Sequence, residues 1–160
     1  MDIIYNAGKI FLDYIVNCAV NDDFWKTTKL DHICYRAESV QEYTNLKNQF
    51  SILGLLFAEN VVNGRQISIF KLSAPIQNEV LSTQWLELAA PKERSNHGVG
   101  FEHIELITPL NLRALVEDNP HLNFNVKNID GNVPEIRLKF SKGVIKFRNK
   151  GIENIILDSV

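Results

Sequence analysis

A motif that occurs twice constrains the fold of this chain more than any other feature of its sequence. The motif is an acidic residue followed by histidine and isoleucine, at Asp31-His32-Ile33 and again at Glu102-His103-Ile104. Each copy lies in a run of residues typical of a β-strand. An internal repeat of this kind indicates two copies of one structural unit, each with a histidine on its first strand.

The first unit is predicted to span residues 29–91. The Asn63-Gly64 pair between two apolar runs is the strongest short-range signal for a β-hairpin. In chain order we expect a strand at residues 30–36, a helix from Ser39 to Gly54, strands at 55–62 and 65–72, and a strand at 84–88 after a loop that contains Pro75. The unit therefore has the order βαβββ.

The second unit, at residues 101–150, repeats this order. We expect a strand at 101–108, a helix at 110–118, and strands at 122–129, 135–140 and 144–148. The tail at 152–157 adds a helix or a strand.

A helical extension at residues 1–28 precedes the two units. Its apolar residues recur at steps of three and four, which predicts an amphipathic helix that packs on a larger core. The predicted apolar stripe is Ile3, Ala7, Ile10, Phe11, Tyr14, Ile15 and Cys18. Residues 1–160 are therefore expected to form a single α+β domain, in which two tandem βαβββ units build a curved mixed sheet around a cleft.

Composition excludes several classes of protein. The formal net charge is −2, and no two Lys or Arg residues are adjacent, so we expect no nucleic-acid partner. The long apolar runs are interrupted by charges and no leader pattern begins the chain, so we expect no membrane span and no secretion. Cys18 and Cys34 lack metal-site or framework spacing and are interpreted as small buried hydrophobes in a reducing, cytoplasmic compartment.

The repeat predicts a candidate metal site. If the units pack about a pseudo-two-fold axis, His32 and His103 converge, and Glu87 on the last strand of the first unit lies beside them. Two imidazoles and one carboxylate suit a divalent ion such as Zn, Fe, Ni or Mn. The alternative for each residue is structural: a histidine satisfied within the sheet, or a solvent-exposed glutamate.

Three further residues are candidates for substrate chemistry. Glu105 shares a strand face with His103 and could act as a general base, or orient an imidazole as a hydrogen-bond acceptor. Arg36 and Arg65 could hold an anionic group, because a guanidinium matches a carboxylate in shape. The alternatives are a plain strand glutamate and surface salt bridges.

Several motifs together resemble the bacterial YecM family, a branch of the vicinal oxygen chelate superfamily that includes glyoxalases, bleomycin-resistance proteins and extradiol dioxygenases. They are Leu30-Asp31-His32-Ile33 with Arg36, Glu59-Asn60, the stretch from Asn63 to Phe70, Glu87-Leu88 with Pro91, and the stretch from Glu102 to Leu106. The resemblance covers essentially the whole chain. It implies metal ligands on the first and last strand of each unit, which carries the role onto His32, Glu87 and His103.

The fourth ligand position departs from the superfamily pattern. The last strand of the second unit offers Lys146 and Arg148 where the pattern calls for a histidine or carboxylate. A cation that faces a metal opposes it electrostatically. We therefore expect a three-ligand site completed by water, or a site that no longer binds metal tightly.

Three functions remain open from the sequence. The first is a metal-dependent isomerase, lyase or dioxygenase that acts on a small oxygen-rich molecule. The second is a metal-free protein that binds a small anion in the same cleft, and the third is an interaction protein with an inert cleft. Because both units are in one chain, either a monomer or a homodimer could contain the complete cleft.

Overall fold

The computed structural model of the chain describes residues 2–19, 22–91 and 99–157. Eight strands within these residues form one mixed sheet in the order β2-β3-β4-β1-β5-β8-β7-β6. The strands are β1 Lys29–Arg36, β2 Gly54–Val62, β3 Arg65–Gln77, β4 Ser82–Ala89, β5 Gly100–Ile107, β6 Asn125–Asn128, β7 Glu135–Phe140 and β8 Gly143–Arg148. The helices are α1 Asp2–Cys18, α2 Asp22–Thr27, α3 Val40–Leu53, α4 Leu112–Glu117 and α5 Ile152–Leu157.

The topology confirms the predicted α+β fold of two tandem βαβββ units. In the first unit β1 pairs parallel with β4, and β4, β3 and β2 follow antiparallel. In the second unit β5 pairs parallel with β8, and β8, β7 and β6 follow antiparallel. The antiparallel pairing of β1 with β5 joins the two halves into one continuous sheet.

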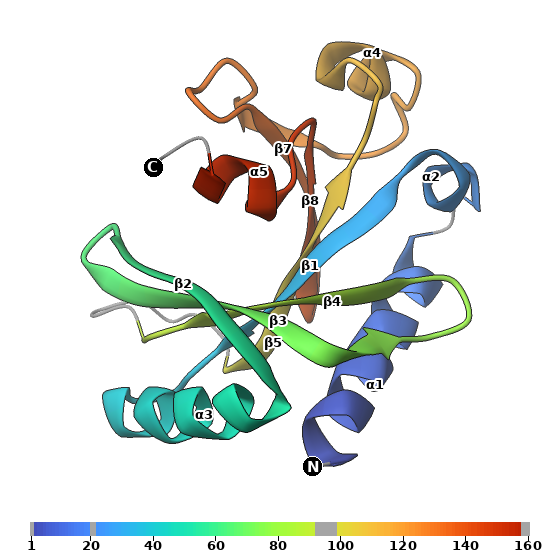
Figure 1. The fold of residues 1–160 in the computed structure, drawn as a ribbon. Coiled ribbons are helices and arrows are strands. Elements are labelled where there is room, and N and C mark those ends of the chain that lie inside the picture. Colours follow the sequence, from blue (N-terminus) through green and yellow to red (C-terminus); the bar gives the residue numbers. More distant parts are fainter. Residues whose placement is uncertain (1, 20–21, 92–98, 158–160) are drawn as a thin grey trace.

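Helices cover the two faces of the sheet differently. Figure 1 shows α1 and α3 on one side of strands β2, β3 and β4 and α5 on the other. We call the side of α1 and α3 the outer face, and the side of α5 the inner face. Leu12 and Ile15 of α1 and Tyr43 and Phe50 of α3 are buried against the outer face in the main apolar core. None of the helices within the described residues is long and apolar enough to cross a membrane.

The predicted stripe of α1 is wrong at two positions. Ile3 and Ile10 are 86% and 61% exposed, whereas Leu12, outside the predicted stripe, is completely buried. Apolar residues occupy three consecutive positions from Ile10 to Leu12, and helical periodicity alone cannot tell which pair faces the core. Gly8 shows which side of α1 faces the sheet, because a Cβ added there would lie 2.6 Å from Ile76 Cγ2 of β3 and only glycine allows this close approach.

Two predicted boundaries also differ from the structure. Pro75 lies within β3 rather than in a loop. The β3–β4 register jumps between Lys71 and Ile76, so this proline sits in an irregular part of the ladder where its missing N–H is tolerated. Strand β6 is shorter than the predicted strand at residues 122–129, because the N–H groups of Leu122 and Phe124 form turn hydrogen bonds instead.

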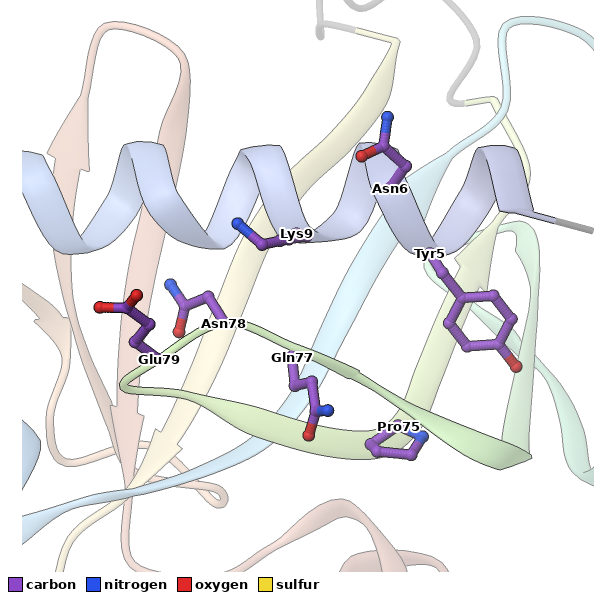
Figure 2. A pocket seen from close by; sticks show the side chains of 7 residues that line it. All are labelled: Tyr5, Asn6, Lys9, Pro75, Gln77, Asn78 and Glu79. Atoms are coloured by element: carbon purple, nitrogen blue, oxygen red, sulfur yellow. The ribbon is translucent and has the colours of Figure 1, made fainter.

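A groove lies between α1 and the turn from β3 to β4. It has a volume of about 440 Å³ and is lined by Tyr5, Asn6, Lys9, Pro75, Gln77, Asn78 and Glu79. Figure 2 shows these side chains spread along α1 and along the end of β3 and the turn that follows, rather than gathered around a common point. Lys9 forms an exposed ion pair with Asp13 one helical turn away. The groove therefore offers no convergent set of functional groups.

The packing of α1 gives a direct stability prediction. Replacement of Leu12 by Ala should lower the free energy of unfolding by about 2–5 kcal/mol, because it removes a fully buried side chain from the core. The matched change Ile10→Ala on the exposed side of α1 should cost about 0.5 kcal/mol or less. Urea unfolding of both variants measures the difference, and equal losses would contradict this orientation of α1.

Candidate metal centre

Two β-bulges in the β1–β5 pair shape the inner face around the repeated motif. From Leu30 to His32 the register advances two residues on β1 but only one on β5, so Asp31 is the extra residue. Near the other end of the pair, Glu102 is the extra residue on β5. A bulge bends its strand and re-aims the neighbouring side chain. In both units the acidic residue of the motif is thus the bulge residue directly before the histidine.

The inner face brings the three predicted metal ligands together. His32 of β1, Glu87 of β4 and His103 of β5 each offer one ligand atom, and these atoms lie within 4.8 Å of one another. The two imidazole rings meet edge to face, with centroids 6.0 Å apart. Both histidines are buried, whereas Glu87 keeps part of its surface exposed. Glu87 is therefore the most accessible of the three side chains.

Asp31 fixes the orientation of His32. Its Oδ2 atom accepts a hydrogen bond from His32 Nδ1 at 2.9 Å and another from the backbone N–H of Ile152, at the start of α5, at 2.8 Å. His32 Nε2 therefore points inward, 3.6 Å from Glu87 and 3.7 Å from Glu105, and has no hydrogen-bond partner among the described residues. A carboxylate behind an imidazole is the usual arrangement for a metal-binding histidine.

The carboxylates around His32 decide its charge. Burial by itself lowers the pKa of His32, but Glu105, Asp31 and Glu87 outweigh it and raise this pKa to about 9. Burial by itself raises the pKa of Glu87, yet the adjacent His32 and the nearby cations hold it well below its usual range. The carboxylate of Glu87 therefore favours a positive charge at the Nε2 atom of His32. In this structure the protonated His32 ring supplies that charge.

Lys146 occupies the position that corresponds to Glu87 in the second unit. Glu87 stands opposite Cys34, two residues after the histidine of β1, and Lys146 stands opposite Glu105, two residues after the histidine of β5. The predicted departure from four ligands is therefore real. Both the sheet register and the contacts of Lys146 place its side chain in the site.

The ammonium of Lys146 contacts the candidate ligand His103 directly. Its Nζ lies 2.9 Å from His103 Nε2 and 3.1 Å from Glu105 Oε1. Burial, together with the charge of Lys146, holds the pKa of His103 well below its usual range, so this imidazole is neutral and its lone pair accepts from the ammonium. The same lone pair would bind a metal. The two histidines and Glu87 thus fit a divalent ion if Lys146 turns to Glu105, its second acceptor.

Glu105, the predicted proton-transfer residue, lies within this charged network. Arg148 Nη1 forms an ion pair with Glu105 Oε2 at 3.1 Å, and Arg148 Nη2 donates a hydrogen bond to Glu135 Oε2 at 2.5 Å. Burial opposes the charge of Arg148, but Glu105 and Glu135 raise its pKa further above the usual value. Glu105 therefore has cations on one side and His32 on the other.

The two predicted anion-binding arginines lie on the inner face. Arg36 is almost completely buried, forms an ion pair with Glu102, and has Nε and Nη1 without hydrogen-bond partners among the described residues. Arg65 shares a strand face with Ile67, and its buried Nε also lacks a partner in this part of the chain. Unsatisfied buried N–H groups are costly, so both arginines retain capacity for an anionic ligand.

Helix α5 covers part of the inner face. Ile152 joins Cys34, Ile67, Ile69 and Ala89 in a small buried cluster, against which Ala58, Trp85 and Ile156 also pack. A pocket of about 590 Å³ opens beside this helix, and its lining includes Asp31, Trp85 and Gly151. Because Asp31 also contacts His32, the pocket approaches the site from the side of the first bulge.

Sequence reasoning missed the roles of Asp31, Glu102 and Cys34. The first two were visible as the acidic residues of the repeat, but only the bulges bring them to the inner face. Cys34 was interpreted as a small hydrophobe, yet its thiol donates to Glu87 Oε1 at 3.2 Å. Burial, with the charges of Glu87 and Glu102, holds the pKa of this thiol well above its usual value.

Comparisons with solved structures define the class of fold. The chain is 29% identical to the structural-genomics protein EC4020, with a TM-score of 0.75 over 95% of this chain and 87% of that one. Methylmalonyl-CoA epimerase of Streptomyces coelicolor, solved with 2-nitronate-propionyl-CoA, is 15% identical, with a TM-score of 0.51 over 78% of this chain and 99% of that one. The chain therefore shares the fold of EC4020 and of this epimerase.

Sequence comparison defines the family. The model of the YecM protein family matches residues 4–156, and Protein YecM of Escherichia coli (strain K12) is 31% identical over 79% of this chain and 76% of its own length. An uncharacterized protein of Haemophilus influenzae is 31% identical over 51% of this chain and 42% of its own length. The chain belongs to the YecM family, as its motifs indicated.

The charge of His32 predicts a pH-dependent contribution to stability in chelator-treated protein. The pKa of His32 in the folded protein, about 9, lies above the ordinary histidine value of 6.5, so its protonation stabilises the fold at low pH and ceases to do so as pH rises through about 9. The stability difference between the parent and His32→Gln should therefore shrink by up to about 3 kcal/mol between about pH 6 and pH 10. Urea unfolding in the presence of chelator measures this, and a difference that stays constant would contradict the assignment.

Proposed function

We propose that this chain is a divalent-metal-dependent enzyme that acts on a small oxygen-rich molecule. The observation that carries the proposal is the convergence of His32, Glu87 and His103 from three adjacent strands, with the buried Nε2 of His32 lacking any partner among the described residues. Zn, Fe, Ni and Mn all accept such a set of nitrogen and oxygen ligands. The epimerase of the same fold was solved with a small-molecule ligand, which supports a substrate of this general kind.

The residues divide into holding and reacting groups. His32, Glu87 and His103 would hold the ion, and Asp31 keeps the Nε2 atom of His32 directed inward. When bound, a divalent ion supplies Lewis-acid chemistry, which polarises a substrate oxygen or acidifies a bound water. Isomerase, lyase and dioxygenase reactions are all compatible with this chemistry.

Glu105 is the proposed proton carrier. Its carboxylate lies 3.7 Å from His32 Nε2 and 3.8 Å from His103 Nε2, so it borders the space that a substrate would share with the ligands. A charge-assisted hydrogen bond from Lys146 and an ion pair with Arg148 hold the carboxylate in place. A fixed carboxylate at this position could remove a proton from substrate and return it to another atom.

Arg36 and Arg65 are the proposed anchors for an anionic group of the substrate. Both lie on the inner face with buried N–H groups that no described residue satisfies. We also propose a cytoplasmic protein, monomeric or homodimeric, with no nucleic-acid partner, in accord with its net charge of −2.

Metal content tests the proposal. Protein purified without chelator or affinity-tag metal should contain about one equivalent of a transition metal, and His32→Ala/His103→Ala should contain none, because two of three ligands are lost. Elemental analysis measures both, with Lys139→Met, an exposed change on β7, as the matched control. If the parent also lacks metal after incubation with iron, nickel, zinc and manganese, the enzyme proposal fails.

A second candidate function is favoured by one observation, the ammonium of Lys146 in contact with His103 and Glu105. A site that contains its own cation could serve as a metal-free receptor for a small anion. In this alternative Lys146 and Arg148 would bind the ligand, with Arg36 at the edge of the site. No ion would be required.

Replacement of Lys146 by Met separates the two candidates. For a metal site, loss of the competing ammonium should increase the affinity for Mn²⁺ or Zn²⁺ by about tenfold or more, since it frees His103 Nε2 and removes a like charge. For an anion receptor, the variant should leave metal binding absent and weaken binding of small carboxylates. Isothermal titration calorimetry of the parent, Lys146→Met and the Lys139→Met control distinguishes these results.

A further inference from the structure

We propose a second cation position on the inner face, formed by Cys34, Glu102 and His103, that takes a thiophilic divalent ion such as Zn²⁺. One ligand atom from each of these residues lies within 4.8 Å of the others. The position shares His103 with the candidate metal centre but uses neither His32 nor Glu87. It therefore does not depend on the proposed enzymatic function.

The β1–β5 pair explains why these residues meet. Cys34 stands directly opposite His103 in the antiparallel register, so both side chains emerge on the inner face at neighbouring positions. The bulge at Glu102 turns an additional carboxylate toward the same pair. Without the bulge, alternation along β5 would direct residue 102 to the outer face.

The unsatisfied nitrogen of His103 points to a ligand. His103 is 2% exposed, and its Nδ1 has no hydrogen-bond partner among the described residues. This atom faces Glu102, whose Oε2 is 4.0 Å away, while Nε2 on the other side of the ring contacts Lys146. The His103 ring therefore lies between two positions that favour a cation. One is beside Nδ1 and Glu102, and the other is beside Nε2, where Lys146 now lies.

The chemistry of the donors defines the class of ion. A thiolate, an imidazole and a carboxylate suit zinc and similar borderline or soft metals rather than magnesium or calcium. Binding requires that the thiol of Cys34 lose its proton, for which Glu87 Oε1 at 3.2 Å is the nearest acceptor. It also requires that the proton of the neutral His103 ring move from Nδ1 to Nε2, with Lys146 turned to Glu105. The ion then compensates the thiolate charge, and Arg36 keeps its ion pair through the Oε2 atom of Glu102.

Cobalt spectroscopy on the full chain, stripped with chelator, tests this second position. Co²⁺ bound to a cysteine thiolate produces an intense near-ultraviolet charge-transfer band, which a site made of His32, Glu87 and His103 alone cannot produce. We expect the band in the parent, in Cys18→Ser and in His32→Ala, and its absence in Cys34→Ser, a nearly isosteric change. Glu102→Gln should keep the band but weaken Co²⁺ binding by about tenfold or more.

Three results would overturn the proposal. They are no band in the parent at excess Co²⁺, a band unchanged in Cys34→Ser, and a band lost in His32→Ala whose circular dichroism matches the parent. The last would mean that Cys34 and His32 bind the same ion. Metal that binds without a charge-transfer band would refute this second position while leaving the proposed enzyme intact, so the two proposals fail separately.

Discussion

The antiparallel pairing of β1 with β5 is the interaction on which the rest of the structure depends. It is the only ladder between the two βαβββ units within the described residues, and it carries both histidines of the repeat. Its two bulges place an acidic residue beside each imidazole on the inner face. A shift of this register by one residue would reverse the faces of His32 and His103 and remove the site altogether.

The two units place different charged residues around their equivalent histidines. In the first unit Asp31 supports His32, and Glu87 supplies a carboxylate from the last strand. In the second unit Glu102 pairs with Arg36 instead, and Lys146 takes the position equivalent to Glu87. The pseudo-symmetric fold therefore holds an asymmetric set of charges, with carboxylates on the side of the first unit and the Lys146 ammonium on the side of the second.

This concentration of buried charge is costly to maintain. Charged groups removed from water lose solvation that their mutual attraction repays only in good geometry, and apolar residues of similar volume would often be at least as stable. His32, Arg36 and Glu105 are nevertheless buried where an ordinary sheet would place aliphatic side chains. Such departures from simple packing concentrate at functional sites, which supports a role in binding or catalysis.

The sequence predicted the architecture better than the details of the site. The histidine repeat and the Asn63-Gly64 turn were sufficient for two βαβββ units, because both signals are local and strong. The orientation of α1 was not predictable, since Ile10, Phe11 and Leu12 are all apolar. The bulges were not predictable either, because strand alternation assumes a regular ladder, and only pairing between distant strands shows where an extra residue is accommodated.

We propose that His32, Glu87 and His103 surround one position for a divalent ion. Anomalous diffraction from crystals of chelator-stripped protein soaked in Mn²⁺ tests it most directly. We expect a peak within bonding distance of His32 Nε2, Glu87 and His103 Nε2, with Lys146 turned toward Glu105. A map with no peak there, and Lys146 still hydrogen-bonded to His103, would contradict it.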